Sequence, residues 1–257
     1  MKKLKFFLAV VAAVLISCCL QGQTSSVKDE LAKAQSLAKQ GNTAEANLIY
    51  LDIMGKHPEN RDAVQGWLML NMKRSPTGEE DAIKQLEELE KTYPDNTGIL
   101  FFKTFIQTEY NHLDDALKNA EKLTVLQPDD DVNWLMKGQI LEAMNRNDEA
   151  LAALEKSTSL GPENADAWQI RAGLLAKINK LDEAISSYGK AIELAPGQPV
   201  FLYNRGCAYC RKGDKANALA DLGKATSMNP QFKAYAAKDE DFKTLWEDED
   251  FKRIISQ

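Results

Sequence analysis

The chain has 257 residues, a formal net charge of −6 and 44% hydrophobic residues. A length of this order allows one or two domains. The negative charge and the lack of a basic stripe argue against a nucleic-acid-binding protein, because such proteins neutralise phosphates with clustered Lys and Arg.

Residues 1–18 have the pattern of a targeting signal. Three lysines within the first five residues precede an apolar run at 6–16, which is too short to span a bilayer as a helix. The run leads into Leu-Ile-Ser-Cys, ending at Cys18, which resembles a bacterial lipobox. The resemblance implies that Cys18 becomes the lipidated first residue of the mature protein. A plain secretory signal is the alternative, and it fits less well because no Ala-x-Ala-like cleavage site follows the run.

Residues 19–26 predict a short polar tether between the lipid and the folded body. Some bacterial surface lipoproteins carry acidic residues directly after the lipidated Cys, and this chain has none there. By resemblance, this favours an outer-membrane anchor that faces the periplasm over display outside the cell. Secretion into the periplasm is the alternative.

A lattice of alanines and prolines runs through the rest of the chain. Six alanines are each followed by a proline twelve residues later, and the last five pairs step by 34 residues. The pairs are Ala46–Pro58, Ala82–Pro94, Ala116–Pro128, Ala150–Pro162, Ala184–Pro196 and Ala218–Pro230. A fixed period of this size indicates one supersecondary unit that is repeated and stacked. The prolines mark where a helix stops and the next unit begins.

Each unit carries the apolar stripes of two helices, most clearly between residues 131 and 230. Large residues open the first helix, a small residue follows four positions later, and a large one three positions after that. These residues are Trp134, Gly138 and Leu141, then Trp168, Ala172 and Leu175, then Leu202, Gly206 and Tyr209. The lattice alanine, with a large residue four positions on, forms the stripe of the second helix.

This pattern resembles the tetratricopeptide repeat (TPR) family over residues 27–232. The resemblance implies an all-α fold, a right-handed α-solenoid of about six TPR helix pairs. The expected repeats are 27–60, 61–96, 97–130, 131–164, 165–198 and 199–232. Two extra residues near 74–78 make the register of the first helix in the second repeat provisional. Residues 233–257 alternate acidic and apolar residues, which resembles the solvating cap of bacterial TPR arrays; a disordered acidic tail is the alternative.

The sequence contains no pattern that predicts catalysis, a cofactor or a metal site. Neither His57 nor His112 has a second ligand at metal spacing, and no phosphate-binding loop or nucleophile elbow is present. Acidic pairs such as Asp182-Glu183 stand at expected helix starts, where they oppose the helix dipole. Cys207 and Cys210 have the spacing of a redox pair, yet they fall inside an expected helix, which favours two thiols that line it.

In the TPR family, ligand contacts come largely from positions 2, 5, 9, 12 and 13 of each repeat, on the concave face. The resemblance therefore implies a partner-binding groove formed by Met69, Met72, Phe101, Phe105, Leu135, Gln139, Gln169, Tyr203, Cys207 and Arg211. Gln35, Gln65, Glu142 and Lys177 occupy the same kind of position. We expect Phe101, Phe105 and Leu135 to form its centre. The alternative is that the cap or a neighbouring repeat covers some of these residues.

The favoured interpretation is a non-catalytic scaffold or adaptor in the bacterial cell envelope, anchored through its N-terminal lipid. It would bind a helical or extended segment of a partner protein in the concave groove. The alternative is an envelope lipoprotein that binds a glycan or a small ligand. It is weaker because the loops between the expected helices are too short for the inserted aromatic platforms of glycan-binding relatives.

Overall fold

The computed structural model describes residues 25–72 and 79–256, and it is helical throughout these ranges, without a β-strand. The expected signal peptide, Cys18 and nearly all of the tether lie outside the described residues. No helix in the described ranges is long and apolar enough to cross a membrane. The chain divides into two compact units, the first ending at Pro128 and the second beginning at Asp129, and each contains three of the six expected repeats.

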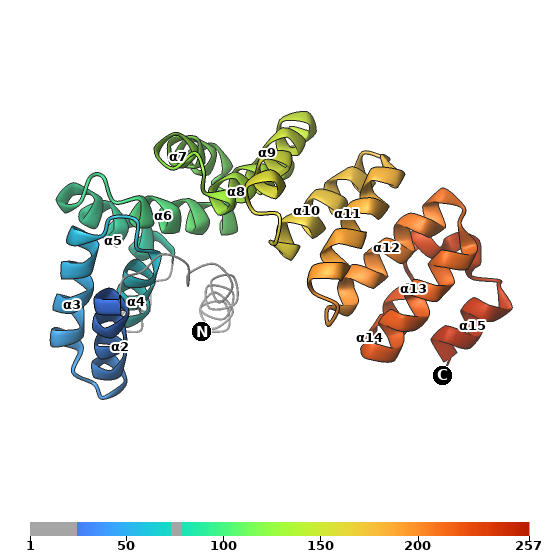
Figure 1. Ribbon diagram of the computed structural model, residues 1–257, viewed down its shortest axis with the longest axis horizontal. Coiled ribbons are helices and arrows are strands. Elements are labelled where there is room, and N and C mark those ends of the chain that lie inside the picture. The colour runs from blue at the N-terminus through green and yellow to red at the C-terminus, as the bar shows by residue number, and fades with distance from the viewer. Residues whose placement is uncertain (1–24, 73–78, 257) are drawn as a thin grey trace. The chain divides into compact units, whose positions relative to one another are not determined.

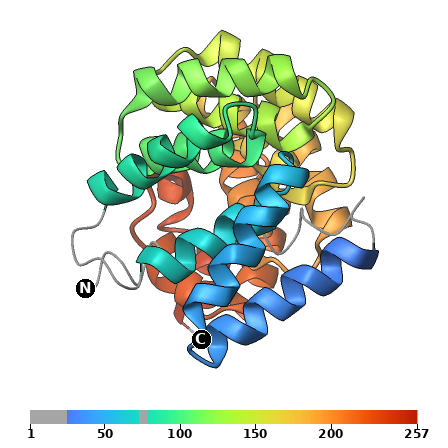
Figure 2. The same ribbon diagram turned by 90° about the vertical axis from the view of Figure 1, so that its left-hand side faces the viewer.

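The first unit consists of three successive helix pairs (Figure 1). The pairs are α2 (Ser25–Lys39) with α3 (Thr43–Lys56), α4 (Arg61–Met72) with α5 (Glu79–Thr92), and α6 (Thr97–Glu109) with α7 (Leu113–Leu126). Helix α2 begins two residues before the expected start at Val27. The insertion predicted near 74–78 falls between α4 and α5, outside the described residues. Figure 2 shows this unit from a second direction, with α3 packed against both α2 and α4.

The second unit repeats the same arrangement and adds a C-terminal segment. Its pairs are α8 (Asp131–Ala143) with α9 (Asn147–Leu160), α10 (Ala165–Lys177) with α11 (Leu181–Leu194), and α12 (Pro199–Lys212) with α13 (Lys215–Met228). The C-terminal segment contains α14 (Gln231–Ala236), a 3-10 helix η1 (Glu240–Leu245) and α15 (Glu249–Ser256). It starts two residues before the expected boundary at 233. Because it is ordered, the disordered-tail alternative does not hold.

The turns inside the helix pairs are made by residues in the left-handed backbone conformation. Asn111, Asn145, Asn179 and Gly213 stand 34 residues apart, and each has a φ between 60° and 86°. Gly41 has the corresponding role between α2 and α3. Asn and Gly adopt this conformation at low cost, so they end one helix and turn the chain into the next.

First helices begin at side-chain caps that follow the same period. Asn96, Asp130 and Asn164 each accept a hydrogen bond from backbone N–H groups in the first turn of α6, α8 and α10. Such a cap stabilises a helix by about 1 kcal/mol because the first N–H groups have no partner inside the helix. At the next boundary Gln198 makes no such bond, and Pro199 takes the first helical position instead.

The lattice alanines form the core of both units. Ala46, Ala82, Ala116, Ala150, Ala184 and Ala218 are all 0% exposed. Gly138 shows why small residues are needed where the two helices of a pair meet. A Cβ atom added there would lie 2.7 Å from the Leu154 side chain, closer than packed carbon atoms approach. The predicted packing of helix pairs is therefore confirmed.

Candidate partner-binding grooves

The structure places the predicted groove residues in several different environments. Phe101, Tyr203 and Cys207 are buried, with 1%, 6% and 7% of their surfaces exposed. Met69, Phe105, Leu135 and Gln169 are partly exposed, and Gln139 and Arg211 are exposed. The side chain of Met72 is not among the described ones. The predicted set is therefore not one continuous open surface in the described residues.

Phe101 is covered from within the first unit. The guanidinium carbon of Arg61 lies 3.9 Å from the centre of its ring, and Phe102 meets it edge-on at 5.5 Å. Both contacts are favourable. The cationic guanidinium of Arg61 is attracted to the negative face of the ring, and the edge-to-face arrangement with Phe102 is a preferred geometry for two aromatic rings. The expectation that Phe101 is open to a partner is corrected: it packs against α4 as a core residue.

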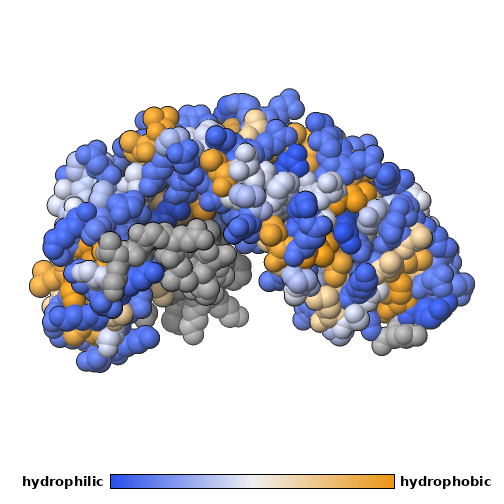
Figure 3. Space-filling view, viewed as in Figure 1, coloured by the Kyte–Doolittle hydropathy of each residue, from blue (hydrophilic) through white to orange (hydrophobic). Residues whose placement is uncertain are grey.

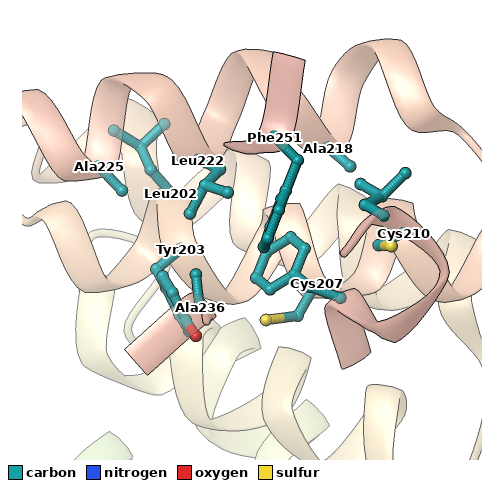
Figure 4. Packing of buried hydrophobic residues seen from close by; sticks show 11 residues of the cluster. Leu202, Tyr203, Cys207, Cys210, Ala218, Leu222, Ala225, Ala236 and Phe251 are labelled. Atoms are coloured by element: carbon teal, nitrogen blue, oxygen red, sulfur yellow. The ribbon is translucent and has the colours of Figure 1, made fainter. Parts of the chain in front are cut away.

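Tyr203 and Cys207 are covered by the C-terminal segment. The Tyr203 hydroxyl donates to Asp239 Oδ2 at 2.7 Å, and the Cys207 thiol donates to the same oxygen at 3.7 Å. Phe232 stacks on the Tyr203 ring at 4.7 Å between centroids. Figure 4 shows Tyr203 and Cys207 beside Phe251 and Ala236 of this segment. The alternative stated above, that a cap covers part of the groove, holds for these two residues.

The C-terminal segment contacts the remaining groove positions of α12 as well. Cys210 Sγ lies 3.3 Å from the Thr244 hydroxyl, and Arg211 Nε lies 3.8 Å from Asp241 Oδ1. Burial raises the pKa of both thiols, so they stay protonated at neutral pH and act as packing groups rather than nucleophiles. The chain itself thus occupies the ligand positions of its last repeat.

An open groove remains between α8 and α10, and we call it the second groove. It has a volume of about 460 Å³ and is lined by Gln139, Glu142, Ala143, Asn145, Gln169, Ile170, Gly173 and Lys177. Lys177 Nζ lies 3.7 Å from Glu142 Oε1 across it. Glutamine amides both donate and accept hydrogen bonds, so this lining suits polar groups such as a peptide backbone.

A comparable groove lies between α2 and α4 of the first unit, and we call it the first groove. Its volume is also about 460 Å³, and its lining is Gln35, Ala38, Lys39, Thr43, Tyr50, Asp62, Gln65, Gly66, Met69 and Leu70. Gln65 and Met69 line it as the provisional register of the second repeat predicted. Its apolar residues Met69 and Leu70 distinguish it from the second groove.

The two grooves share a pair of glutamines at the same repeat positions. With repeats counted from residues 27, 61, 131 and 165, Gln35 and Gln139 are ninth in their repeats. Gln65 and Gln169 are fifth in the repeats that follow. Each groove therefore has one glutamine from each of two consecutive first helices.

An all-helical array of this kind, with grooves between successive first helices, defines an α-solenoid of the tetratricopeptide type. Sequence profiles of the tetratricopeptide repeat match residues 135–199 and 200–232, so the second unit contains tetratricopeptide repeats. A comparison with curated proteins gave no significant match.

Several solved protein structures share the fold at low sequence identity. MamA residues 41–end from Desulfovibrio magneticus RS-1 is 19% identical over 66% of this chain and 96% of that one, with a TM-score of 0.59. YrrB, described as a TPR protein with an unusual peptide-binding site, is 20% identical over 70% and 92%, with a TM-score of 0.54. A TPR protein of Thermus thermophilus is 21% identical over 70% and 94%, with a TM-score of 0.52. These similarities establish the fold.

Proposed function

We propose that this protein is a non-catalytic scaffold of the bacterial cell envelope that binds a segment of a partner protein in its grooves. The observation that carries the proposal is the glutamine pair repeated at the same positions in both grooves. Two glutamine amides in the lining of one groove can donate to and accept from the C=O and N–H groups of a helical or extended segment. The peptide-binding site described for YrrB supports the same use of this fold.

The groove chemistry favours a polar contact in the second unit over the aromatic centre expected from the sequence. Gln139 and Gln169 lie beside the Glu142–Lys177 ion pair, whereas Phe101 and Tyr203 are core residues. The face drawn in Figure 3 is mostly hydrophilic, with hydrophobic residues in smaller areas between. We therefore assign partner contact to Gln139 and Gln169, with Leu135 as a partly exposed neighbour on α8.

Replacing Gln139 and Gln169 together with alanine is expected to weaken partner capture by about tenfold. Each lost hydrogen bond contributes about 0.5–1.5 kcal/mol, and about 1.4 kcal/mol corresponds to a factor of ten. The measurement is the yield of the partner band after affinity capture from solubilised envelope. The matched control replaces two other exposed glutamines of the second unit, Gln198 and Gln231. Equal yields from the two double variants would contradict the assignment.

The envelope location rests on Cys18 and the signal that precedes it. We propose that Cys18 is acylated and that several acyl chains hold the protein at the membrane, since one chain gives only marginal binding. The Cys18→Ser variant is then expected to lose its added lipid mass and to stay uncleaved at this position. Intact mass spectrometry of fractionated cells measures both changes. A wild-type mature protein without added lipid mass would exclude the anchor.

A further inference from the structure

Tyr50 forms the floor of the first groove, beneath Gly66. Its side chain belongs to α3, and only 2% of its surface is exposed. A Cβ atom added at Gly66 would lie 2.5 Å from Cζ of the Tyr50 ring and 2.7 Å from its hydroxyl oxygen. Carbon atoms do not approach so closely without displacement. The Tyr50 ring therefore packs directly on the backbone of Gly66, and a glycine is needed for the ring to take this place in the groove lining.

The Tyr50 hydroxyl has no hydrogen-bond partner among residues 25–72 and 79–256. Tyr50 Oη is not one of the fully buried side-chain atoms that lack a partner in this part of the chain, so the hydroxyl group is accessible from the groove that Tyr50 lines. Burial also raises the pKa of Tyr50, so the hydroxyl keeps its proton at neutral pH and remains a donor. The groove thus presents a protonated hydroxyl group that makes no hydrogen bond to the described part of the chain and can donate to a ligand.

Gly173 in the lining of the second groove also lies near a tyrosine, although Tyr188 itself is not part of that lining. A Cβ atom added at Gly173 would lie 3.8 Å from the Tyr188 hydroxyl oxygen, and Tyr188 is 4% exposed. Its hydroxyl likewise has no hydrogen-bond partner in the described part of the chain. A groove glycine beside a buried tyrosine hydroxyl therefore occurs in both units, although the approach is much closer in the first.

The lining of the first groove defines what fits above Tyr50. Met69, Leu70 and Ala38 supply apolar surface, while Lys39 and Asp62 place opposite charges in the same lining. Opposite charges in one lining favour neither a cationic nor an anionic group. An uncharged apolar group with a hydrogen-bond acceptor satisfies the apolar surface and the donor together.

From this geometry we propose that the first groove is a side-chain pocket for an extended peptide segment. An aliphatic side chain of the partner lies in the groove against Met69 and Leu70, and a backbone carbonyl oxygen of the same segment accepts from Tyr50 Oη. This rests on the proposed function and adds the chemistry of the partner residue. Tyr50 and Gly66 then determine specificity together with the apolar side chains of α4 that line the same groove.

The pocket is tested with blocked amino acids as probes, using the full chain with ¹³C-methyl methionine and NMR detection. N-acetyl-leucine amide is expected to shift the Met69 methyl signal saturably, with a Kd on the order of 1 mM for so small a ligand. The exposed Met228, in α13 of the other unit, is the internal control and is expected not to shift. The amide of N-acetyl-lysine, which carries a charge, is expected to bind more weakly.

Two substitutions connect the binding to the floor of the groove. Tyr50→Phe keeps the ring and removes only the donor, so binding is expected to weaken about two- to tenfold. Gly66→Ala is expected to abolish binding, and its melting temperature is recorded because the added methyl group also displaces the Tyr50 ring. An unshifted Met69 methyl signal, or equal affinity of Tyr50→Phe and the wild type, overturns the proposal.

The result of the amide-binding test can be distinguished from the result of the partner-capture test. The Gln139 and Gln169 double variant alters only the second groove, so it is expected to bind N-acetyl-leucine amide as the wild type does. If that variant loses its partner while the amide still binds, the proposed function stands and the pocket stands with it. If the amide fails to bind while the capture result holds, only the pocket is overturned.

Discussion

Replacing Phe242 with alanine is expected to lower the free energy of unfolding of the second unit by about 3–5 kcal/mol, the usual cost of deleting a buried phenylalanine. Phe242 is 0% exposed and lies between the rings of Tyr203 and Phe251, at 5.6 and 5.8 Å. The C-terminal segment contributes a second fully buried ring in Phe251, so this segment forms part of the core around α12. Urea unfolding followed by circular dichroism measures the loss.

Tyr235→Ala is the matched control, because this aromatic side chain lies in the same segment and is 60% exposed. We expect it to change stability by less than about 1 kcal/mol. If Phe242→Ala and Tyr235→Ala unfold at the same urea concentration, the segment is not packed on α12. Tyr203 and Cys207 would then return to the list of accessible groove residues.

Replacing Ala150 with phenylalanine is expected to destabilise the second unit by about 1–3 kcal/mol or more through overpacking. Ala150 is 0% exposed, and its carbonyl oxygen lies 3.4 Å from where a Cβ atom on Gly138 would be. The larger side chain forces α8 and α9 apart, and the effect spreads because each repeat is stabilised by its neighbours. Differential scanning calorimetry measures the change in melting temperature.

Ala152 in the same helix is exposed and serves as the control for this substitution. Ala152→Phe adds the same ring to the same helix on its solvent side, where we expect little loss of stability. If the two variants melt together, the helix faces inferred from the 34-residue lattice are wrong. If Ala150→Phe alone melts early, the buried role of the lattice alanines is supported.

Most of the fold could be predicted because its signals are local. The alanine and proline period, and the Asn or Gly residue at each turn, act within about a dozen residues of the contacts they determine. Such short-range signals repeat in every unit. An error in placing the helices of one repeat would therefore conflict with the positions of the equivalent residues in the other repeats. Gln65 and Met69, which the provisional register of the second repeat placed in the groove, line the first groove.

The candidate site was harder to predict, because position in a repeat defines the face of a helix but not what covers that face. Phe101 is covered by Arg61 from α4, forty residues earlier in the chain. Tyr203 and Cys207 are covered by Asp239, which lies on a segment outside the repeat pattern. These contacts depend on side chains with no counterpart in the other repeats, so the period contains no signal for them.

The contact between Gly66 and Tyr50 was missed for a related reason. Each residue fits an ordinary repeat pattern on its own helix, and only the packing of α4 against α3 brings them together. By contrast, the four glutamines were already placed on the concave face by the register alone. The assignment of these glutamines to partner contact stays a prediction.

Site-specific crosslinking in living cells tests the central claim most directly. A photo-crosslinking amino acid is placed at Gln139 of the second groove, or at the exposed Lys156 of α9, a second helix, as the control. Partner segments that lie between α8 and α10 are within reach of the first position only. The account predicts one crosslinked protein from position 139 and none from position 156. Crosslinking of the same protein with equal yield from both positions, or from position 156 alone, would contradict it.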